Sequence, residues 1–194
     1  MSKAVYISAV VLYIINKIRQ IRMELGLSQR EVSQMINPGS NANLVGTIET
    51  ETSSAAYTDS QLHILTKKFS RVAEIRQTEF DLIPDNRNQI KTVYTMADFY
   101  PSAKVEDKLV VKKIETIEKD LYPTGALYNM LEDGDFLNLP RTTKEITDEA
   151  NRRFNKTWQT TDFVSPLDRA TSIGIIVKTP PPADVTYQKA KFNG

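Results

Sequence analysis

The stretch Leu27-Ser28-Gln29-Arg30-Glu31-Val32-Ser33 carries the clearest structural signal in the chain. Ser28 and Glu31 have the spacing of a capping box, in which the serine hydroxyl accepts from the amide three residues on and the glutamate accepts from the serine amide. A short amphipathic helix is therefore predicted to open at Ser28, and Asn37-Pro38-Gly39-Ser40 forces a turn after it. A further helix from about residue 41 to residue 50 includes Thr47-Ile48-Glu49. The sequence thus predicts two short helices joined by a turn, the second with small polar side chains on its outer face.

Helices are also predicted on both sides of this pair. Upstream, apolar residues recur every three or four positions on one helical stripe, and Gly26 follows them as a left-handed helix terminator. Downstream, Thr58 and Gln61 form another capping box ahead of a second apolar stripe. The two stripes are Ile14, Ile18, Ile21 and Leu25, and Leu62, Leu65 and Phe69. Residues 1–80 are therefore expected to form a compact bundle of four or five short helices.

This domain resembles the phage-repressor-type (Xre-like) helix-turn-helix family. The resemblance covers about residues 12–70 and rests on Leu27-Ser28-Gln29, on Ile48-Glu49 and on the closing stripe from Leu62 to Phe69. It implies that the third helix enters the major groove of DNA, where asparagine suits an adenine edge and threonine a thymine methyl group. The DNA-binding residues that it implies here are Gln29, Arg30, Ser40, Asn41, Asn43 and Thr47. A helical domain of the same topology that binds protein instead is the alternative.

Composition excludes several function classes. The chain of 194 residues has 25 basic and 24 acidic side chains, so only local clustering could supply contacts to phosphate. It has no cysteine, which excludes disulfides, thiolate zinc sites and cysteine nucleophiles and fits a reducing compartment. His63 is the only histidine, and the seven glycines form no phosphate-binding loop. We therefore expect no enzyme activity, no metal, no cofactor and no small-molecule ligand.

The apolar N-terminal run from Ala4 to Ile15 is shorter than a membrane span needs and continues into a charged helix. A signal peptide would show a stronger basic start and a cleavage site of small residues. The run is therefore expected to form a buried strand or the start of a helix, with a membrane or export segment, or an over-extended start of the reading frame, as the alternatives. A cytoplasmic protein is the expected outcome.

Residues 81–117 are interpreted as a connector that could add a strand or a helix to one neighbour. Pro84-Asp85-Asn86-Arg87-Asn88-Gln89 has the composition of a loop, and Leu109-Val110-Val111 is a short, isolated apolar run. Lys112-Lys113 opens a stretch of mixed charge that is typical of a solvated helical face. We expect this basic pair to serve solubility rather than recognition.

Residues 118–194 predict a second domain. A helical stripe around Leu127 and Met130 precedes a short strand at Phe136-Leu137-Asn138-Leu139, and Thr142 and Glu145 form a third capping box. The next helix is expected to be capped by Thr160 or Thr161, which would place Pro166 within its first turn, and to end at Gly174. Two strands follow, Ile175–Lys178 and Val185–Lys189, around a proline-rich tip.

The order helix, strand, helix, helix and two-strand ribbon resembles a winged helix over about residues 122–190. The segments that carry the resemblance are Arg141–Ile146, Ser165–Ala170 and Ile173–Lys178. It implies a third helix that contacts DNA, and a wing that lies on the DNA backbone through two lysines. The contact residues that it implies are Thr160, Thr161, Ser165 and Arg169 for the helix, and Lys178 and Lys189 for the wing. Winged helices also serve as docking or dimerisation modules, and that alternative stays open.

The sequence as a whole predicts a mainly α protein with an N-terminal helix-turn-helix bundle and a C-terminal winged-helix-like domain containing a small β ribbon. The expected function is sequence-specific binding of double-stranded DNA in transcription regulation. A homodimer is expected, because paired half-sites supply the affinity that one small module rarely reaches. The alternative is a protein-interaction adaptor that uses both domains as docking or dimerisation surfaces.

Overall fold

A computed structural model describes residues 4–39, 43–81, 90–103, 105–106, 108–115, 121–132, 134–179 and 185–190. The predicted DNA contacts Ser40 and Asn41 lie outside these residues. The chain is mainly helical with two small antiparallel sheets, and it divides into two compact units, Met1–Ile117 and Glu118–Gly194.

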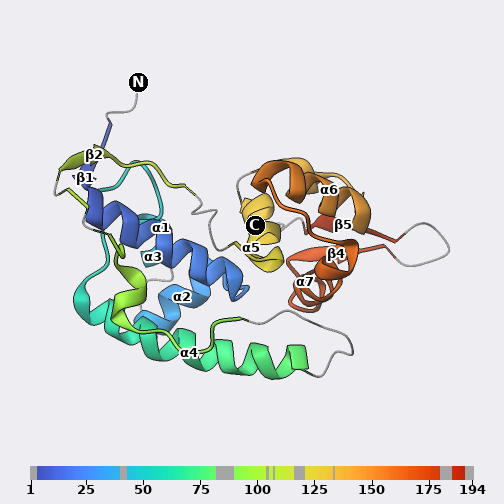
Figure 1. The fold of residues 1–194 in the computed structure, drawn as a ribbon, viewed down its shortest axis with the longest axis horizontal. Helices are drawn as coiled ribbons and strands as arrows, with labels where there is room; N and C mark the ends of the chain where they lie inside the picture. The colour runs from blue at the N-terminus through green and yellow to red at the C-terminus, as the bar shows by residue number, and fades with distance from the viewer. Residues whose placement is uncertain are drawn as a thin grey trace. The chain divides into compact units, whose positions relative to one another are not determined.

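The first unit is a helical bundle with a two-stranded ribbon (Figure 1). Its elements are β1 (Tyr6–Ser8), α1 (Ala9–Glu24), α2 (Gln29–Ile36), α3 (Leu44–Ile48), α4 (Asp59–Asp81), the 3-10 turn η1 (Met96–Phe99) and β2 (Leu109–Val111). In Figure 1, α1, α2 and α3 lie on one side of the long helix α4. The described part of 90–115 adds η1 and β2 to this unit, and β2 pairs antiparallel with β1.

The predicted apolar stripes form the core of the first unit. All four residues of the upstream stripe and all three of the downstream stripe are buried. Phe69 also meets the rings of Tyr94 and Phe99 edge to face, which fixes the segment after α4 onto that helix. The two predicted capping boxes are present at Ser28 and Thr58, and Gly26 has the left-handed φ of 64° that ends α1.

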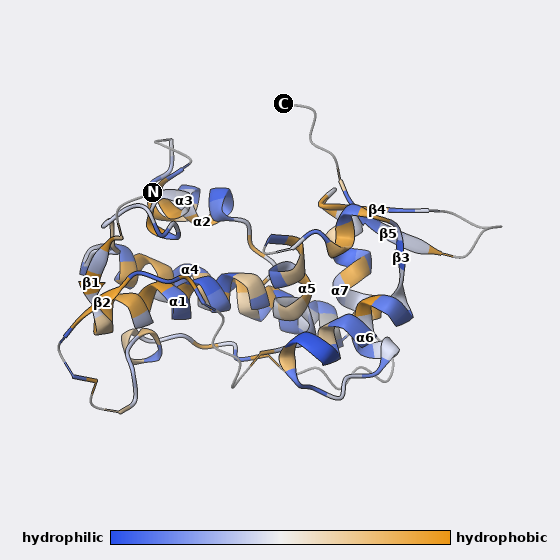
Figure 2. Ribbon diagram, turned by 90° about the horizontal axis from the view of Figure 1, so that it is seen from above, coloured by the Kyte–Doolittle hydropathy of each residue, from blue (hydrophilic) through white to orange (hydrophobic). Residues whose placement is uncertain are grey.

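The N-terminal run forms β1 and the first turns of α1, which agrees with the predicted strand or helix start, but only Ile7 of the strand is buried, and Tyr6 is exposed. No helix in the described part of the chain combines the length and the apolar character needed to cross a membrane. Figure 2 shows β2 coloured as hydrophobic, while α6 is more hydrophilic.

The second unit packs three helices against a three-stranded sheet. Its elements are α5 (Pro123–Glu132), the 3-10 turn η3 (Phe136–Asn138), β3 (Arg141–Thr142), α6 (Thr143–Phe154), α7 (Thr160–Ser172), β4 (Ile176–Lys178) and β5 (Thr186–Lys189). The strands are antiparallel in the order β3-β5-β4, and Figure 1 shows β4 and β5 extending from the helices as a ribbon. Its core is Leu121, Ala126, Leu127, Met130, Leu131, Leu137, Ile146, Ala150, Phe154, Phe163, Leu167, Ala170, Ile176 and Tyr187.

Three local predictions for the second unit were wrong. Phe136–Leu139 is not a strand, because Asn138 bonds back to Asp135 through both its backbone and its side chain and closes η3. Helix α7 is capped by Gln159, whose amide donates to the Asp162 carboxylate at 2.8 Å, rather than by Thr160 or Thr161. The helix therefore starts earlier than predicted, and Pro166 lies in its interior, where one backbone hydrogen bond is missing.

Candidate nucleic-acid interface

The α2–α3 pair is fixed by a serine that is buried between the two helices. The Ser33 hydroxyl donates to the Gln29 carbonyl at 2.8 Å and accepts from the Val45 amide at 2.9 Å. Val45 lies in the first turn of α3, whose amides have no partner within the helix. The Ser33 side chain of α2 thus supplies the N-terminal capping bond that α3 does not receive from its own cap residue, Asn43.

A buried ion pair holds the end of α3 against α1. Arg22 Nε donates to both oxygens of the Glu49 carboxylate, at 2.9 and 3.0 Å, and Arg22 Nη2 donates at 2.5 Å. Both side chains have no contact with solvent. Gln29 was predicted to contact DNA. In the structure, its side-chain Nε2 donates to the Glu49 carboxylate at 3.0 Å and so links the start of α2 to the end of α3. Arg22 is not one of the residues of the predicted apolar stripe in α1, and its partner lies 27 positions away.

The outer face of α3 presents Asn43 and Thr47, which are both exposed and one helical turn apart. The Thr47 hydroxyl donates to the Asn43 carbonyl at 3.1 Å. A Cβ at Gly46 would lie 2.4 Å from the Asn43 side-chain oxygen, so glycine there leaves room for the Asn43 amide along the helix surface. Arg30 at the start of α2 is exposed and makes no ion pair with any residue that the structure describes.

The carboxylates that follow α3 are held away from this polar face. Glu49 is neutralised inside the unit by Arg22. Glu51 accepts a hydrogen bond from the Ile114 amide at 3.1 Å, which directs its carboxylate to the segment after β2. Although Glu49 and Glu51 follow α3 closely in the sequence, their carboxylates are bound elsewhere in the unit and do not surround Asn43 and Thr47.

Lys112 contradicts the prediction that the pair Lys112-Lys113 serves solubility. Lys112 is 1% exposed, and its ammonium donates to the carbonyls of Ile48, Ser53 and Ala55 at 2.6, 2.8 and 3.2 Å. Burial lowers the pKa of this lysine, and nearby Glu49 opposes that shift. Only Lys113 behaves as predicted, because its side chain is exposed and pairs with Glu115 at the surface.

The predicted contacts of the second unit lie on α7 and on the ribbon. Thr160 and Thr161 are exposed at the start of α7, whereas Ser165 and Arg169 are half-buried. Lys178 on β4 pairs with Asp168 of α7 at 3.0 Å, and the hydrogen bond to this carboxylate raises the lysine's pKa. Lys189 donates to the Leu131 carbonyl at 2.7 Å, which turns it toward α5.

Three arginines in or just before α6, namely Arg141, Arg152 and Arg153, pair with glutamates of that helix. Glu149 accepts from Arg152 at 2.8 Å and from Arg153 at 2.5 Å, and these bonds lower the pKa of Glu149 to about 2. Arg141 stacks over the Phe136 ring and approaches Glu145. These arginines therefore offer less net positive charge than the sequence alone indicates.

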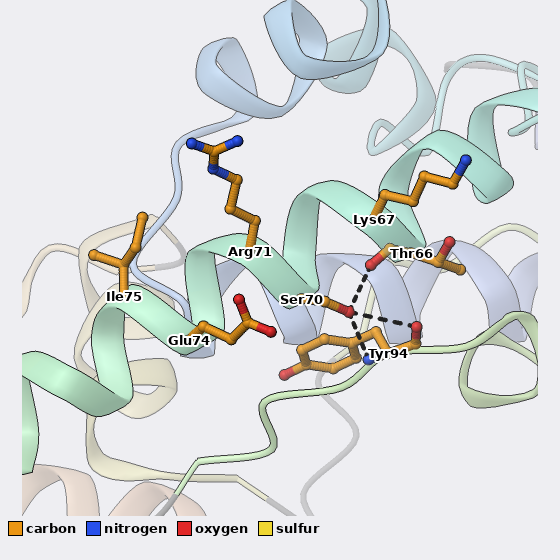
Figure 3. Close-up of a pocket in the computed structure, with 7 residues that line it drawn as sticks. All are labelled: Thr66, Lys67, Ser70, Arg71, Glu74, Ile75 and Tyr94. Carbon is orange, nitrogen blue, oxygen red and sulfur yellow. Dashed lines mark hydrogen bonds between the residues drawn. The ribbon is translucent and has the colours of Figure 1, made fainter.

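An open depression beside α4 is lined by Thr66, Lys67, Ser70, Arg71, Glu74, Ile75 and Tyr94. Figure 3 shows Lys67 and Arg71 extending away from Tyr94, so the charged groups do not converge on one point. The Ser70 hydroxyl instead accepts from the Tyr94 amide at 2.8 Å and donates to the Thr66 carbonyl at 2.8 Å. The polar groups at the centre of this depression are thus used to attach the segment after α4.

Comparison with known proteins found no matching protein-family model, no matching curated protein and no matching solved structure.

Proposed function

We propose that the protein binds double-stranded DNA and regulates transcription, with α3 in the major groove. The proposal rests on one observation: α3 is fixed from beneath by Ser33 and by the Arg22–Glu49 pair, while Asn43 and Thr47 face solvent. A helix held in this way is suited to base-edge contacts, because its exposed side chains need little further ordering on binding.

The chemistry of the exposed pair favours A·T steps. An asparagine amide can donate to and accept from one adenine edge, and a threonine methyl can pack on a thymine methyl group. Helix α3 contains no lysine or arginine, so contacts to phosphate must come from neighbouring positions. The exposed Arg30 at the start of α2 is the first candidate for that role.

We further propose that the second unit is a winged helix that adds a DNA contact or the contact of a homodimer. The element order α5-β3-α6-α7-β4-β5 and the sheet order β3-β5-β4 support this assignment. Thr160 and Thr161 on α7 would be its contacts to bases. Lys178 would reach a phosphate only by exchanging its partner Asp168.

Selection from a pool of random duplexes tests the proposal directly. The full chain should enrich related sequences, and its affinity for them should fall steeply as the salt concentration rises, because bound phosphates release counterions. Failure to retain any duplex at low salt would overturn the proposal.

Substitutions on α3 test the reading mechanism. Asn43→Ala combined with Thr47→Ala should relax site preference by about 1 to 3 kcal/mol per lost base contact while affecting non-specific affinity little. Ser60→Ala combined with Thr78→Ala removes two exposed hydroxyls from α4 and should change neither quantity. An equal loss of affinity for all sequences in the α3 variant would contradict a groove-reading role. Thr160→Ala combined with Thr161→Ala applies the same test to α7.

A protein-interaction adaptor is the second candidate, favoured by apolar side chains on the surface of the second unit. Val164 on α7 is 48% exposed, Ile173 after α7 is 48% exposed, and Val177 on β4 is 58% exposed. Apolar docking depends weakly on salt, so a partner retained equally at low and high ionic strength would favour this function.

A further inference from the structure

Helix α3 has few means of its own to stay ordered. It is five residues long, its cap residue Asn43 makes no side-chain capping bond, and the segment 50–57 that follows contains a turn but neither helix nor strand. A helix of this length is not stable by itself, and its last carbonyls have no partner within the helix. Its position must therefore come from contacts with other parts of the unit.

Lys112 supplies the contact at the C-terminal end. One of its three bonds goes to the carbonyl of Ile48, the last residue of α3, and the other two go to Ser53 and Ala55 in the following segment. A lysine ammonium has three donors, and all three are used here. The ammonium group of Lys112 thereby links the last residue of α3 to residues 53 and 55 of the segment that follows.

The residues after Lys112 are attached to the same region. The Lys112 amide donates to the Val5 carbonyl at 2.7 Å, which continues the β1–β2 ladder. The buried Asn16 of α1 donates to the Lys113 carbonyl at 3.3 Å and accepts from the Glu115 amide at 3.2 Å, as a neighbouring strand would. With the bond from Ile114 to Glu51, residues 112–115 form a strap across α1 and the end of α3.

We propose that Lys112 is the positioning residue for α3. Through the strap 112–115, the ordered conformation of α3 then depends on the segment that precedes the second unit in the sequence. The effect on DNA rests on the proposed function, but the effect on the order of α3 does not. A solubilising lysine would leave α3 unaffected when changed, and a lysine of general structural importance would affect the whole unit equally.

Hydrogen exchange on the full chain separates these cases, with Lys112→Met as the test and Lys113→Met as the matched control one residue away. In Lys112→Met, amides in 44–57 should exchange about tenfold faster or more, because three carbonyls lose their donor. Amides in the middle of α1 and α4 should keep their protection, and Lys113→Met should match the unmodified chain throughout. Unchanged exchange in 44–57, or an equal rise across the whole first unit, would overturn the proposal.

A surface variant keeps the test open if Lys112→Met does not fold. Glu51→Ala removes the bond to the Ile114 amide, and it should raise exchange in 44–57 by about threefold, since that bond is exposed to water. No change there would count against the strap. DNA affinity is measured on the same variants and should fall with the loss of protection. Faster exchange in 44–57, in a chain that retains no duplex, would support the positioning role and reject the DNA function.

Discussion

In the first unit, Arg22, Glu49 and Lys112 have lost almost all contact with water, whereas the ion pairs described in the second unit keep contact with water. The Arg22–Glu49 pair has no solvent exposure, while Arg152 and Asp168 of the second unit are 71% and 54% exposed in their pairs. A buried charge is costly when it loses its partner, because water cannot replace the bond. A surface pair contributes little, because water and salt screen it. In the first unit, buried charged groups therefore fix the position of α3. In the second unit, the ion pairs are screened by water and contribute less to stability.

The largest effect is expected at Glu49. Glu49→Gln removes the negative charge and leaves the Arg22 guanidinium buried without compensation, so the free energy of unfolding of the first unit should fall by about 3 to 5 kcal/mol. Urea unfolding followed by far-UV circular dichroism measures this loss. The single tryptophan, Trp158, packs edge to face on Phe163, so its fluorescence reports separately on the second unit.

Glu79→Gln is the control for Glu49→Gln, because it breaks an ion pair with Arg76 in the same unit, where the glutamate is 51% exposed. It should cost less than about 1 kcal/mol. Replacing both buried partners, as in Arg22→Met with Glu49→Leu, should recover much of the loss, since no unpaired charge remains. Similar losses for Glu49→Gln and Glu79→Gln would remove the contrast between buried and exposed ion pairs.

The second effect concerns acid stability through Glu149. Its pKa is about 2 in the folded chain against an ordinary 4.5, so folding favours the ionised form. The stabilisation is complete above pH 4.5 and is lost as the pH falls from 4.5 towards 2. The shift corresponds to at most about 3 kcal/mol, and screening around the exposed Arg152 should reduce this by roughly half.

Urea unfolding of the second unit at several pH values, followed by Trp158 fluorescence, measures this dependence. Glu149→Gln should lower stability at pH 7 and flatten the decline between pH 4.5 and 2. If the stability of the Glu149→Gln variant declined between pH 4.5 and 2 as steeply as that of the original chain, other carboxylates would be the cause of the decline.

The two capping boxes at Ser28 and Thr142 offer a matched comparison of intermediate size. In both, the hydroxyl accepts from a glutamate amide three residues on at 3.2 Å, and the glutamate accepts from the cap amide at 2.8 Å. Ser28→Ala and Thr142→Ala should each cost about 1 kcal/mol. Measured by the same two unfolding signals, each loss should be confined to its own unit. A much larger loss for Ser28→Ala would show that α2 depends on its cap as strongly as α3 depends on Lys112.

Local features of the fold could be predicted because their partners are close in sequence. The three capping boxes, the left-handed Gly26 and Gly174, and the apolar stripes all involve residues within a few positions of one another. The errors in the second unit also come from bonds between residues close in sequence. Bonds to the carboxylates of Asp135 and Asp162 competed with the predicted ones and decided where η3 and α7 begin.

The buried charges could not be predicted in this way. Arg22 finds its partner 27 residues away, and Lys112 finds its partners 57 to 64 residues away. The sequence around Lys112 shows only alternating charge, which is equally typical of a solvated surface. At the candidate interface, the exposed position of Asn43 and Thr47 could be predicted because helical spacing determines which face they occupy. The role of Gln29 in bracing Glu49 depended on the same distant pairing.

The smallest effect is expected at Lys178, which provides the surface counterpart of Lys112. Lys178 is 39% exposed in its ion pair with Asp168 and lies over the Tyr187 ring at 5.6 Å. Lys178→Met keeps the aliphatic contact with that ring and removes only the screened charge, so the stability of the second unit should change by less than about 0.5 kcal/mol. Trp158 fluorescence during urea unfolding measures the change, and raising the salt concentration should abolish it. A loss as large as the one expected for Glu49→Gln would mean that charge at the ribbon stabilises its unit as strongly as the buried charge at the end of α3. If Lys178 contacts a phosphate, the same substitution should lower the salt dependence of DNA binding by about one counterion while leaving the fold intact.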